Sequence, residues 1–298
     1  MSEFIDNLLQ TINKSLYQGI YWCTEQLFNS IQNVMDIGIS NSREVIMQSP
    51  QQWNSDAFSF IRNITQNAAI PIAGCILTFV FCWQVINMVQ ESNQMHNIKP
   101  ETMLLLLIKL IICLLVCSKS FEIVNGLFNI GKWATEHVPF FGLESTGEMA
   151  FQNVLSAELD DYNFKVVMQM LVNLFLTFIA LILIYVLSIT VYIRANIWYL
   201  ELLIYASAAP MPFATFMNKE WGQVGTNYLR KMLAMAFEGF FMLIAFGLYN
   251  VFVAKVISNN HAPDQYLMSM ITTCGCGIGL VMILNKAGTI SASIFNAH

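Results

Sequence analysis

Three ionisable side chains interrupt otherwise apolar stretches of the sequence, and they are its clearest candidates for chemistry. Lys109 lies inside LLLLIKLIICLLVC, Glu201 precedes an apolar stretch that ends at two prolines, and Glu238 lies in another long apolar stretch. A charge at the centre of a bilayer costs roughly 2.5 to 3.5 kcal/mol on insertion scales. We therefore expect these side chains to face a bundle interior or an aqueous path. The alternative is a structural ion pair of Lys109 with Glu201 or Glu238.

Patterns for catalysis and metal binding are weak by comparison. The four histidines are scattered, and none lies at metal-ligand spacing from a cysteine or carboxylate. Six of the seven cysteines fall within apolar stretches, where cysteine packs as a small side chain. The sequence holds no phosphate-binding loop of Walker type. We expect no enzymatic activity, no cofactor and no metal site.

Small residues and prolines predict two places of close helix packing. Gly275 and Gly279 form a GxxxG pair in an apolar stretch, a pattern that lets helix backbones approach each other in lipid. Ala208 and Ala209 precede Pro210 and Pro212, and proline removes a backbone donor and clashes one turn back. Such a break persists in lipid only where neighbouring helices or local water satisfy the freed backbone groups. We expect a kinked helix inside a bundle or beside a cavity.

The segment 218–231, which follows this kink, is basic and amphipathic. It carries Lys219, Trp221, Arg230 and Lys231. Short basic flanks with an interfacial Trp are common beside membrane spans, where they set the orientation. The alternative is a docking surface for an ATPase or another cytoplasmic partner.

Composition places all of these residues in a polytopic membrane protein. Of the 298 residues, 56% are hydrophobic and 11% are charged, with a mean hydropathy of +0.56, whereas an ordinary soluble domain carries about 25% charge. The net charge of -5 argues against a chain-wide surface for nucleic acid, which needs clustered Lys and Arg. The sequence predicts an all-α integral membrane bundle of about six transmembrane helices, with five to seven as the range.

Four regions are expected along the chain. Residues 1–66 hold an amphipathic helix over 3–39, lying in the membrane interface or against a partner, and a polar linker over 40–56. Residues 67–124 hold two spans, residues 125–165 an acidic central loop, and residues 166–298 a C-terminal bundle that includes the basic segment. The expected spans are 68–89, 103–124, 166–193, 197–217, 232–257 and 267–284, with polar turns at 93–100 and 258–265.

Six spans would put both termini on one side of the membrane. Of the 14 Lys and Arg residues, Lys109 lies within a span, and only Lys99, Arg194 and Lys255 lie on the other side. Because basic residues are enriched on the cytoplasmic side, this distribution places the N-terminus in the cytoplasm.

The order of these parts resembles the TrbL-type polytopic subunits of type IV secretion systems, most closely the versions in conjugative elements of Gram-positive bacteria. Shared features are the amphipathic N-terminal helix, the sizeable central loop and the clustered spans. The motif similarity falls within about residues 194–249. It is carried by Glu201, Ala208-Ala209-Pro210, Pro212, Trp221 and residues 227–233.

The resemblance implies a homo-oligomeric channel subunit in the bacterial cytoplasmic membrane. Such a subunit would contact other type IV secretion membrane subunits and ATPases, and single-stranded DNA with its attached relaxase would pass it. The resemblance also implies an external N-terminus and an external central loop, in conflict with the distribution of Lys and Arg.

Two other functions are compatible with the same residues. A secondary transporter or channel for a small solute would bind its substrate near Lys109, Glu201 and the broken helix. Transporters of that kind show paired repeats, whereas the first three and last three predicted spans do not correspond. A non-conducting scaffold would assemble other subunits of the secretion machine without touching the substrate.

Overall fold

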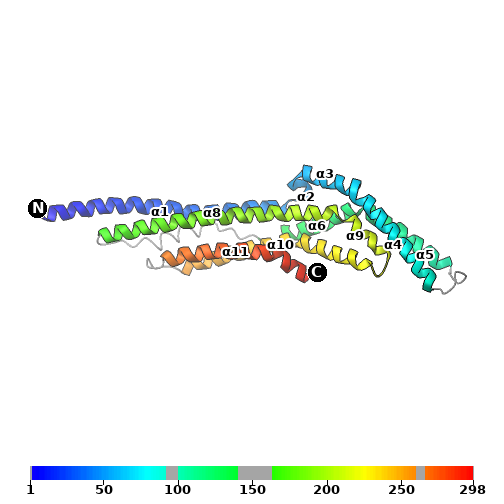
Figure 1. Cartoon of the computed structure of the whole chain (residues 1–298). Coiled ribbons are helices and arrows are strands. Elements are labelled where there is room, and N and C mark those ends of the chain that lie inside the picture. Colours follow the sequence, from blue (N-terminus) through cyan, green and yellow to red (C-terminus); the bar gives the residue numbers. More distant parts are fainter. Residues whose placement is uncertain (1, 92–99, 140–162, 260–265, 298) are drawn as a thin grey trace. The chain divides into compact units, whose positions relative to one another are not determined.

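The computed structural model describes residues 2–91, 100–139, 163–259 and 266–297, and every regular element among them is a helix (Figure 1). Five stretches are long and apolar enough to cross a membrane: Ser55–Gln90, Pro100–Ser118, Phe164–Met217, Gly222–Lys255 and Met270–Ile294. The predicted all-α polytopic class is confirmed. The number of candidate spans lies at the lower end of the expected range.

The first helix, α1 (Ser2–Met47), is longer than predicted and takes in half of the expected polar linker. Polar side chains in this part of the helix hydrogen-bond to its own backbone. The Ser42 hydroxyl, for example, donates to the Gly38 carbonyl one turn back at 2.6 Å. Ile39 and Ile46 extend its buried face. The helix ends before Ser49, which caps α2 (Pro50–Trp53) in a capping box.

The first candidate span is a continuous run of α3 (Ser55–Ile64), η1 (Thr65–Ala69) and α4 (Ile70–Glu91). η1 is a single wide π-helical turn that ends two residues before Pro71. Because proline offers no backbone donor and crowds the turn before it, a wider turn at this point relieves the conflict. The span therefore begins earlier than the predicted residue 68.

The second candidate span, α5 (Pro100–Ser118), is followed by α6 (Ser120–Glu136) after an interruption at Lys119. The start of the expected acidic loop is thus helical. Residues 140–162 of that loop, and most of the predicted turns at 93–100 and 258–265, lie outside the described residues, as do His96, His261 and His298.

Helix α8 (Phe164–Ser207) joins the predicted third and fourth spans into one helix of 44 residues. The expected division at Arg194 is wrong, because no Gly or Pro stands there to end the helix. Asn196 is accommodated by a hydrogen bond, its Oδ1 accepting from Trp53 Nε1 at 3.0 Å. At 1.5 Å per residue α8 is roughly 66 Å long, about twice the hydrocarbon thickness. It is therefore longer than one crossing requires.

The remaining elements are α9 (Pro210–Ala214), η3 (Thr215–Met217), α10 (Gly222–Asn259) and α11 (Tyr266–Ile294). An odd number of crossings would put the two termini on opposite sides of the membrane and would make the distribution of basic residues between the two sides more even. The cytoplasmic placement of the N-terminus stays a prediction.

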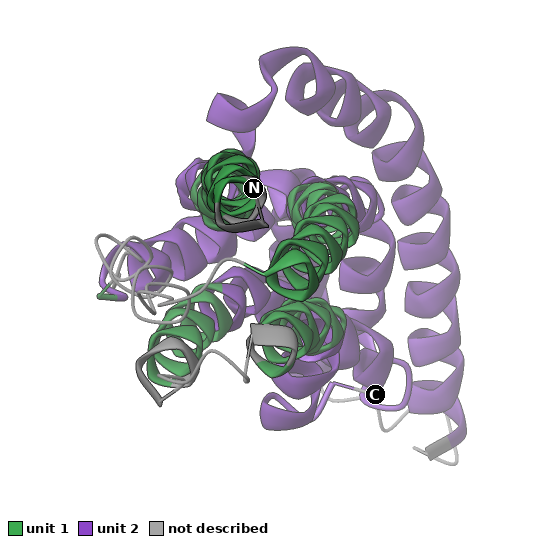
Figure 2. Ribbon diagram, turned by 90° about the vertical axis from the view of Figure 1, so that its left-hand side faces the viewer, with its two compact units in different colours: residues 1–43, 139–194, 243–285 green, residues 44–138, 195–242, 286–298 purple. Residues whose placement is uncertain are grey.

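The chain divides into two compact units (Figure 2). Unit 1 comprises Met1–Arg43, Pro139–Arg194 and Leu243–Asn285. Unit 2 comprises Glu44–Val138, Ala195–Met242 and Lys286–His298. Helices α1, α8, α10 and α11 each contribute residues to both units.

Helices of unit 1 lie close together at two glycines. Gly38 of α1 lies against Ser188 of α8, where an added Cβ would be 2.1 Å from the Ser188 hydroxyl oxygen. That hydroxyl donates to the carbonyl of Val34 at 2.8 Å. Gly277 of α11 also faces α8, where an added Cβ would be 2.9 Å from a methyl carbon of the Leu187 side chain. Small residues bring helices together where lipid offers no hydrophobic drive.

Unit 2 has an aromatic core with satisfied polar atoms. The rings of Trp53 and Tyr199 stack with centroids 5.2 Å apart, and the Tyr199 hydroxyl donates to the Gln48 carbonyl. Trp198 Nε1 donates to the carbonyl of Met235 at 3.0 Å. Buried aromatic side chains contribute most when their polar atoms have partners, as they have here.

Helices α6 and α10 of unit 2 meet at Gly131, where an added Cβ would lie 2.1 Å from the backbone oxygen of Ala236. We expect Gly131→Ala to lower the free energy of unfolding by about 1 to 3 kcal/mol, because the helices must separate. Thermal unfolding of the detergent-solubilised protein measures the change.

The matched control is Gly126→Ala in the same helix, where an added Cβ meets nothing within 4 Å. Replacing a helical glycine by alanine there should stabilise the protein by roughly 0.5 to 1 kcal/mol. An equal melting temperature for the two variants would contradict the close contact at Gly131.

Candidate functional site

The break between α8 and α10 is the most irregular part of unit 2, and we call residues 208–221 the reversal segment. Helix α8 ends at Ser207, and Pro210 opens α9 at a position where its missing donor is least needed. Ala208 and Ala209 form the turn between them, donating to the carbonyls of Tyr205 and Ala206 at 3.2 and 3.3 Å. The prolines thus stand at the start of a new helix.

Helix α9 lies at the centre of unit 2, against α4, α5 and α6. Its side chains are enclosed, since Ala209, Phe213 and Ala214 are at most 1% exposed. The Cys113 thiol of α5 lies 3.8 Å from the carbonyl oxygen of Phe213. The break is therefore surrounded by protein, as irregular backbone at membrane depth must be.

Thr215 ties α9 to the first turn of α10. Its hydroxyl donates to the Pro212 carbonyl at 2.7 Å and accepts from the Gly225 backbone N–H at 3.2 Å. Gly225 comes so close that an added Cβ would lie 2.7 Å from the Pro212 oxygen. Asn218 accepts from the backbone N–H of Glu220 at 2.7 Å and so orders the intervening turn.

The basic segment 218–231 is divided between two environments. Lys219, Trp221 and Arg230 are exposed, and Trp221 packs edge-on against Phe79 of α4, with centroids 5.9 Å apart. Lys231 is half-buried, with its Nζ 6.0 Å from the centre of the Tyr205 ring. Three of the four side chains are therefore open at the surface of unit 2.

The three charged side chains predicted within spans do not converge. Lys109 of α5 and Glu201 of α8 are exposed, whereas Glu238 of α10 is 3% exposed. Within the described part of the chain neither Lys109 nor Glu201 makes an ion pair, so the alternative of a structural pair of Lys109 with Glu201 or Glu238 is not found there. Glu238 lies against Gly288 of α11, where an added Cβ would be 3.0 Å from its carboxyl group.

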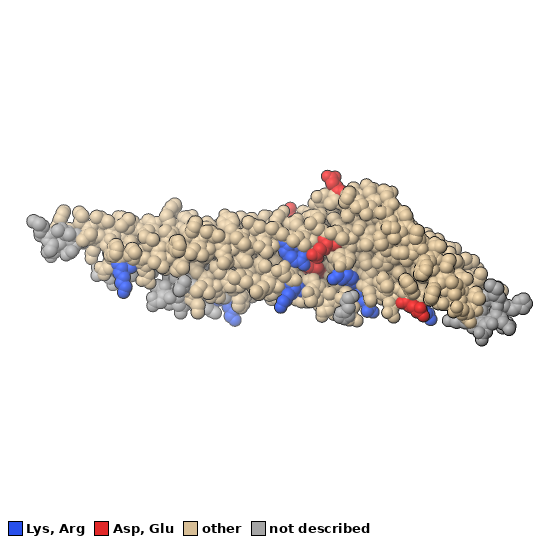
Figure 3. All heavy atoms as spheres, viewed as in Figure 1, with Lys and Arg blue, Asp and Glu red and all other residues tan. Residues whose placement is uncertain are grey.

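Charged side chains are also sparse on the molecular surface, and the face in Figure 3 is mostly free of them. This is the pattern expected of a chain whose surface meets lipid. The exposed Lys109 and Glu201 are exceptions to it.

Gly275 and Gly279 make no close helix contact within the described chain. An added Cβ at either position meets nothing within 4 Å, and both residues line an open groove in unit 1. The glycines that do lie against another helix are Gly38, Gly131, Gly225, Gly239, Gly277 and Gly288. No spacing pattern in the sequence distinguishes them, because each contact partner lies on a distant or separately folded segment.

Metal-ligating side chains do not gather anywhere in the described ranges. Among those residues no group of three or more His, Cys, Asp or Glu side chains is placed to hold an ion, and all seven cysteines are free thiols. The site offers hydrogen bonds and charge, with no assembled catalytic set among the described side chains.

A family profile described as "TrbL/VirB6 plasmid conjugal transfer like protein" matches residues 35–210, more than half of the chain. The chain belongs to the TrbL/VirB6 conjugal transfer family. The predicted resemblance is thus confirmed. The matched region includes Glu201 and Ala208-Ala209-Pro210. It ends before Pro212, Trp221 and residues 227–233, so these residues do not contribute to the family match. Searches among curated proteins and among solved structures find no significant match.

Membership of the TrbL/VirB6 family, together with five candidate spans, identifies a membrane component of conjugal transfer. The matched region ends at Pro210, the first residue of α9. The reversal segment is therefore mostly outside it.

The hydroxyl of Thr215 predicts a specific weakness of the reversal segment. Thr215→Val removes the hydroxyl oxygen that accepts from the buried Gly225 N–H. We therefore expect the free energy of unfolding to fall by about 1 to 3 kcal/mol. Limited proteolysis between Met217 and Gly222 should become faster, and the melting temperature should fall.

Thr226→Val is the control, because that hydroxyl is exposed and donates only to Gly222 of its own helix. Membrane insertion should be normal in both variants. Equal proteolysis rates in the two would show that Thr215 does not hold the reversal segment.

Proposed function

We propose that the protein is a channel subunit of a conjugative type IV secretion system in the bacterial cytoplasmic membrane. Several copies surround a path for single-stranded DNA with its attached relaxase, and partner ATPases supply the energy. The observation that carries this proposal is the exposure of Lys109 and Glu201 on apolar helices of a TrbL/VirB6-family chain.

Lys109 is poorly placed for a lipid-facing side chain. It is the tenth of the 19 residues of α5, and its exposed neighbours Leu105, Ile108 and Ile112 are apolar. Facing lipid at this depth would cost roughly 2.5 to 3.5 kcal/mol. A neighbouring copy or an aqueous path removes that penalty.

Glu201 supports the same conclusion from another helix. It is exposed on α8 beside Leu200 and Ile204, which are 49% and 62% exposed. Its charge is opposite to that of Lys109, and neither side chain has a partner within the described chain. A second copy can therefore supply to each side chain the charge that the first copy leaves unmatched.

The exposed part of the basic segment is the surface that we assign to other subunits. Lys219 and Trp221 lie outside the enclosed core of α9, on the turn into α10 that the Asn218 side chain orders, and Arg230 is exposed on α10 itself. A cationic surface with an aromatic anchor suits an acidic face of an ATPase or of another secretion subunit.

Site-specific crosslinking during DNA transfer tests the channel role. A photoreactive amino acid is placed at Lys109 or Glu201 in the full chain, and adducts are collected from mating cells. We expect DNA adducts at one or both positions, dependent on the transfer ATPases. Ile86, an exposed apolar position on α4, is the control and should give none.

Protein adducts without DNA adducts at Lys109 and Glu201 would overturn the channel role in favour of a scaffold. Normal DNA transfer in cells that lack this protein would overturn both the channel role and the scaffold role. A solute transporter would then be the remaining function.

Charge exchange tests the contact between copies. Lys109→Glu and Glu201→Lys each place two like charges at the interface, so each should weaken assembly roughly hundredfold. The double variant should regain oligomers, measured by the mass of the detergent complex. Co-expression of the two single variants should restore part of the assembly, since some interfaces then carry opposite charges. Oligomers of wild-type size in both single variants would contradict the contact.

A further inference from the structure

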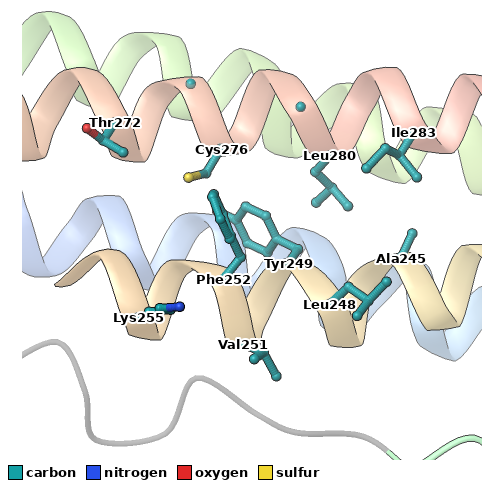
Figure 4. A pocket seen from close by; sticks show the side chains of 12 residues that line it. Ala245, Leu248, Tyr249, Val251, Phe252, Lys255, Thr272, Cys276, Leu280 and Ile283 are labelled. Atoms are coloured by element: carbon teal, nitrogen blue, oxygen red, sulfur yellow. The ribbon is translucent and has the colours of Figure 1, made fainter. Parts of the chain in front are cut away.

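A groove of about 630 Å³ runs between α10 and α11 within unit 1 (Figure 4). Its walls are almost entirely apolar, with Leu248 and Phe252 from α10 and Leu280 and Ile283 from α11. Leu248 and Phe252 are 64% and 57% exposed, so the groove opens to the surroundings of the helices. A cleft of this kind at membrane depth is filled by lipid or by another helix.

Two glycines leave one wall of the groove open. Gly275 and Gly279 line it, and an added Cβ at either position meets nothing within 4 Å. Glycine lowers the stability of a helix relative to alanine, so these residues weaken α11 without bringing a neighbouring helix closer. Space at these positions is what the glycines provide.

A positive charge marks one end of the groove. Lys255 lines it, four residues before α10 ends at Asn259. At the same end is Thr272, six residues after α11 begins at Tyr266, while Ala245 and Ile283 lie at the other end (Figure 4). Both helices therefore place the Lys255 end at the membrane boundary, where a lysine reaches the headgroup region.

The groove is as deep as one leaflet. Its α10 wall runs from Ala245 to Lys255, which at 1.5 Å per residue is about 15 Å. The hydrocarbon core is about 30 Å thick, so the groove extends from the boundary to the midplane. A packed transmembrane helix would need a contact along the whole span, whereas an acyl chain occupies half of it.

We propose that this groove binds one anionic phospholipid. An acyl chain lies along Leu248, Phe252 and the two glycines, and the phosphate lies at the ammonium group of Lys255, which has three N–H donors to share among its partners. Basic pockets between transmembrane helices recognise acidic headgroups in this way. The site is independent of the channel role, because it lies wholly in unit 1 and includes neither Lys109 nor Glu201.

Native mass spectrometry of the full chain in detergent tests the proposal, with phosphatidylglycerol and phosphatidylcholine of identical acyl chains as probes. The wild type should bind one phosphatidylglycerol in preference to phosphatidylcholine. Lys255→Met should weaken phosphatidylglycerol binding about fivefold and abolish the preference. Lys165→Met, at another exposed lysine of unit 1, is the charge control and should bind as the wild type does.

Gly279→Leu fills the groove and should abolish binding of both lipids. Its matched control is Gly247→Leu on α10, where an added Cβ also meets nothing within 4 Å and which does not line the groove. Melting temperatures near that of the wild type show that both variants fold. Equal lipid binding by the two leucine variants, or equal binding of the two lipids to the wild type, would overturn the proposal. Loss of oligomers in Gly279→Leu, with lipid binding intact, would assign the groove to a second copy.

Discussion

Backbone hydrogen bonding at the break between α8 and α10 is the constraint on which unit 2 depends. In hydrocarbon each freed backbone group needs a protein or water partner. Here short turn bonds supply several, among them Gly222 N–H to the Asn218 carbonyl at 2.8 Å. The hydroxyl of Thr215 supplies another by bonding to both sides of the reversal. Since α9 is also enclosed by α4, α5 and α6, the fold of these three helices is what permits the break.

Glycine has two opposite uses in this chain, and both follow from the weak drive for helix association in lipid. Where a helix must pass close to another, as at Gly131 and Ala236, the absence of a Cβ allows contact between backbones. At Gly275 and Gly279 the same absence leaves room for a lipid chain. What lies opposite the glycine decides between the two uses.

The features that the sequence predicted well are those set by local chemistry. The break at Pro210 depends on the missing backbone donor of proline, a property of the residue itself. The predicted division of α8 at Arg194 is wrong, because a charged residue alone does not end a helix. No Gly or Pro enforces an end there. Local signals thus locate breaks more reliably than they locate membrane boundaries.

The arrangement of the site was less predictable, because it depends on contacts between distant segments. Hydropathy treats Lys109, Glu201 and Glu238 alike, whereas only Glu238 is buried, against a glycine some fifty residues further along the chain. The GxxxG spacing shows that helices can approach, but it does not say that a partner is present. Gly131 has no pattern of its own, and its contact with Ala236 required the fold.

The two exposed charges give the membrane a part in the assembly of the protein. A single copy with Lys109 and Glu201 at its lipid-facing surface carries a free-energy penalty that packing within the chain does not relieve. Association of copies relieves it, and does so only when opposite charges meet. Apolar helices alone associate with little preference for register, since lipid competes equally for their surfaces. In the proposed channel the same two charges therefore destabilise a single copy in lipid and set the register between neighbouring copies. They also place polar side chains next to the path of the DNA.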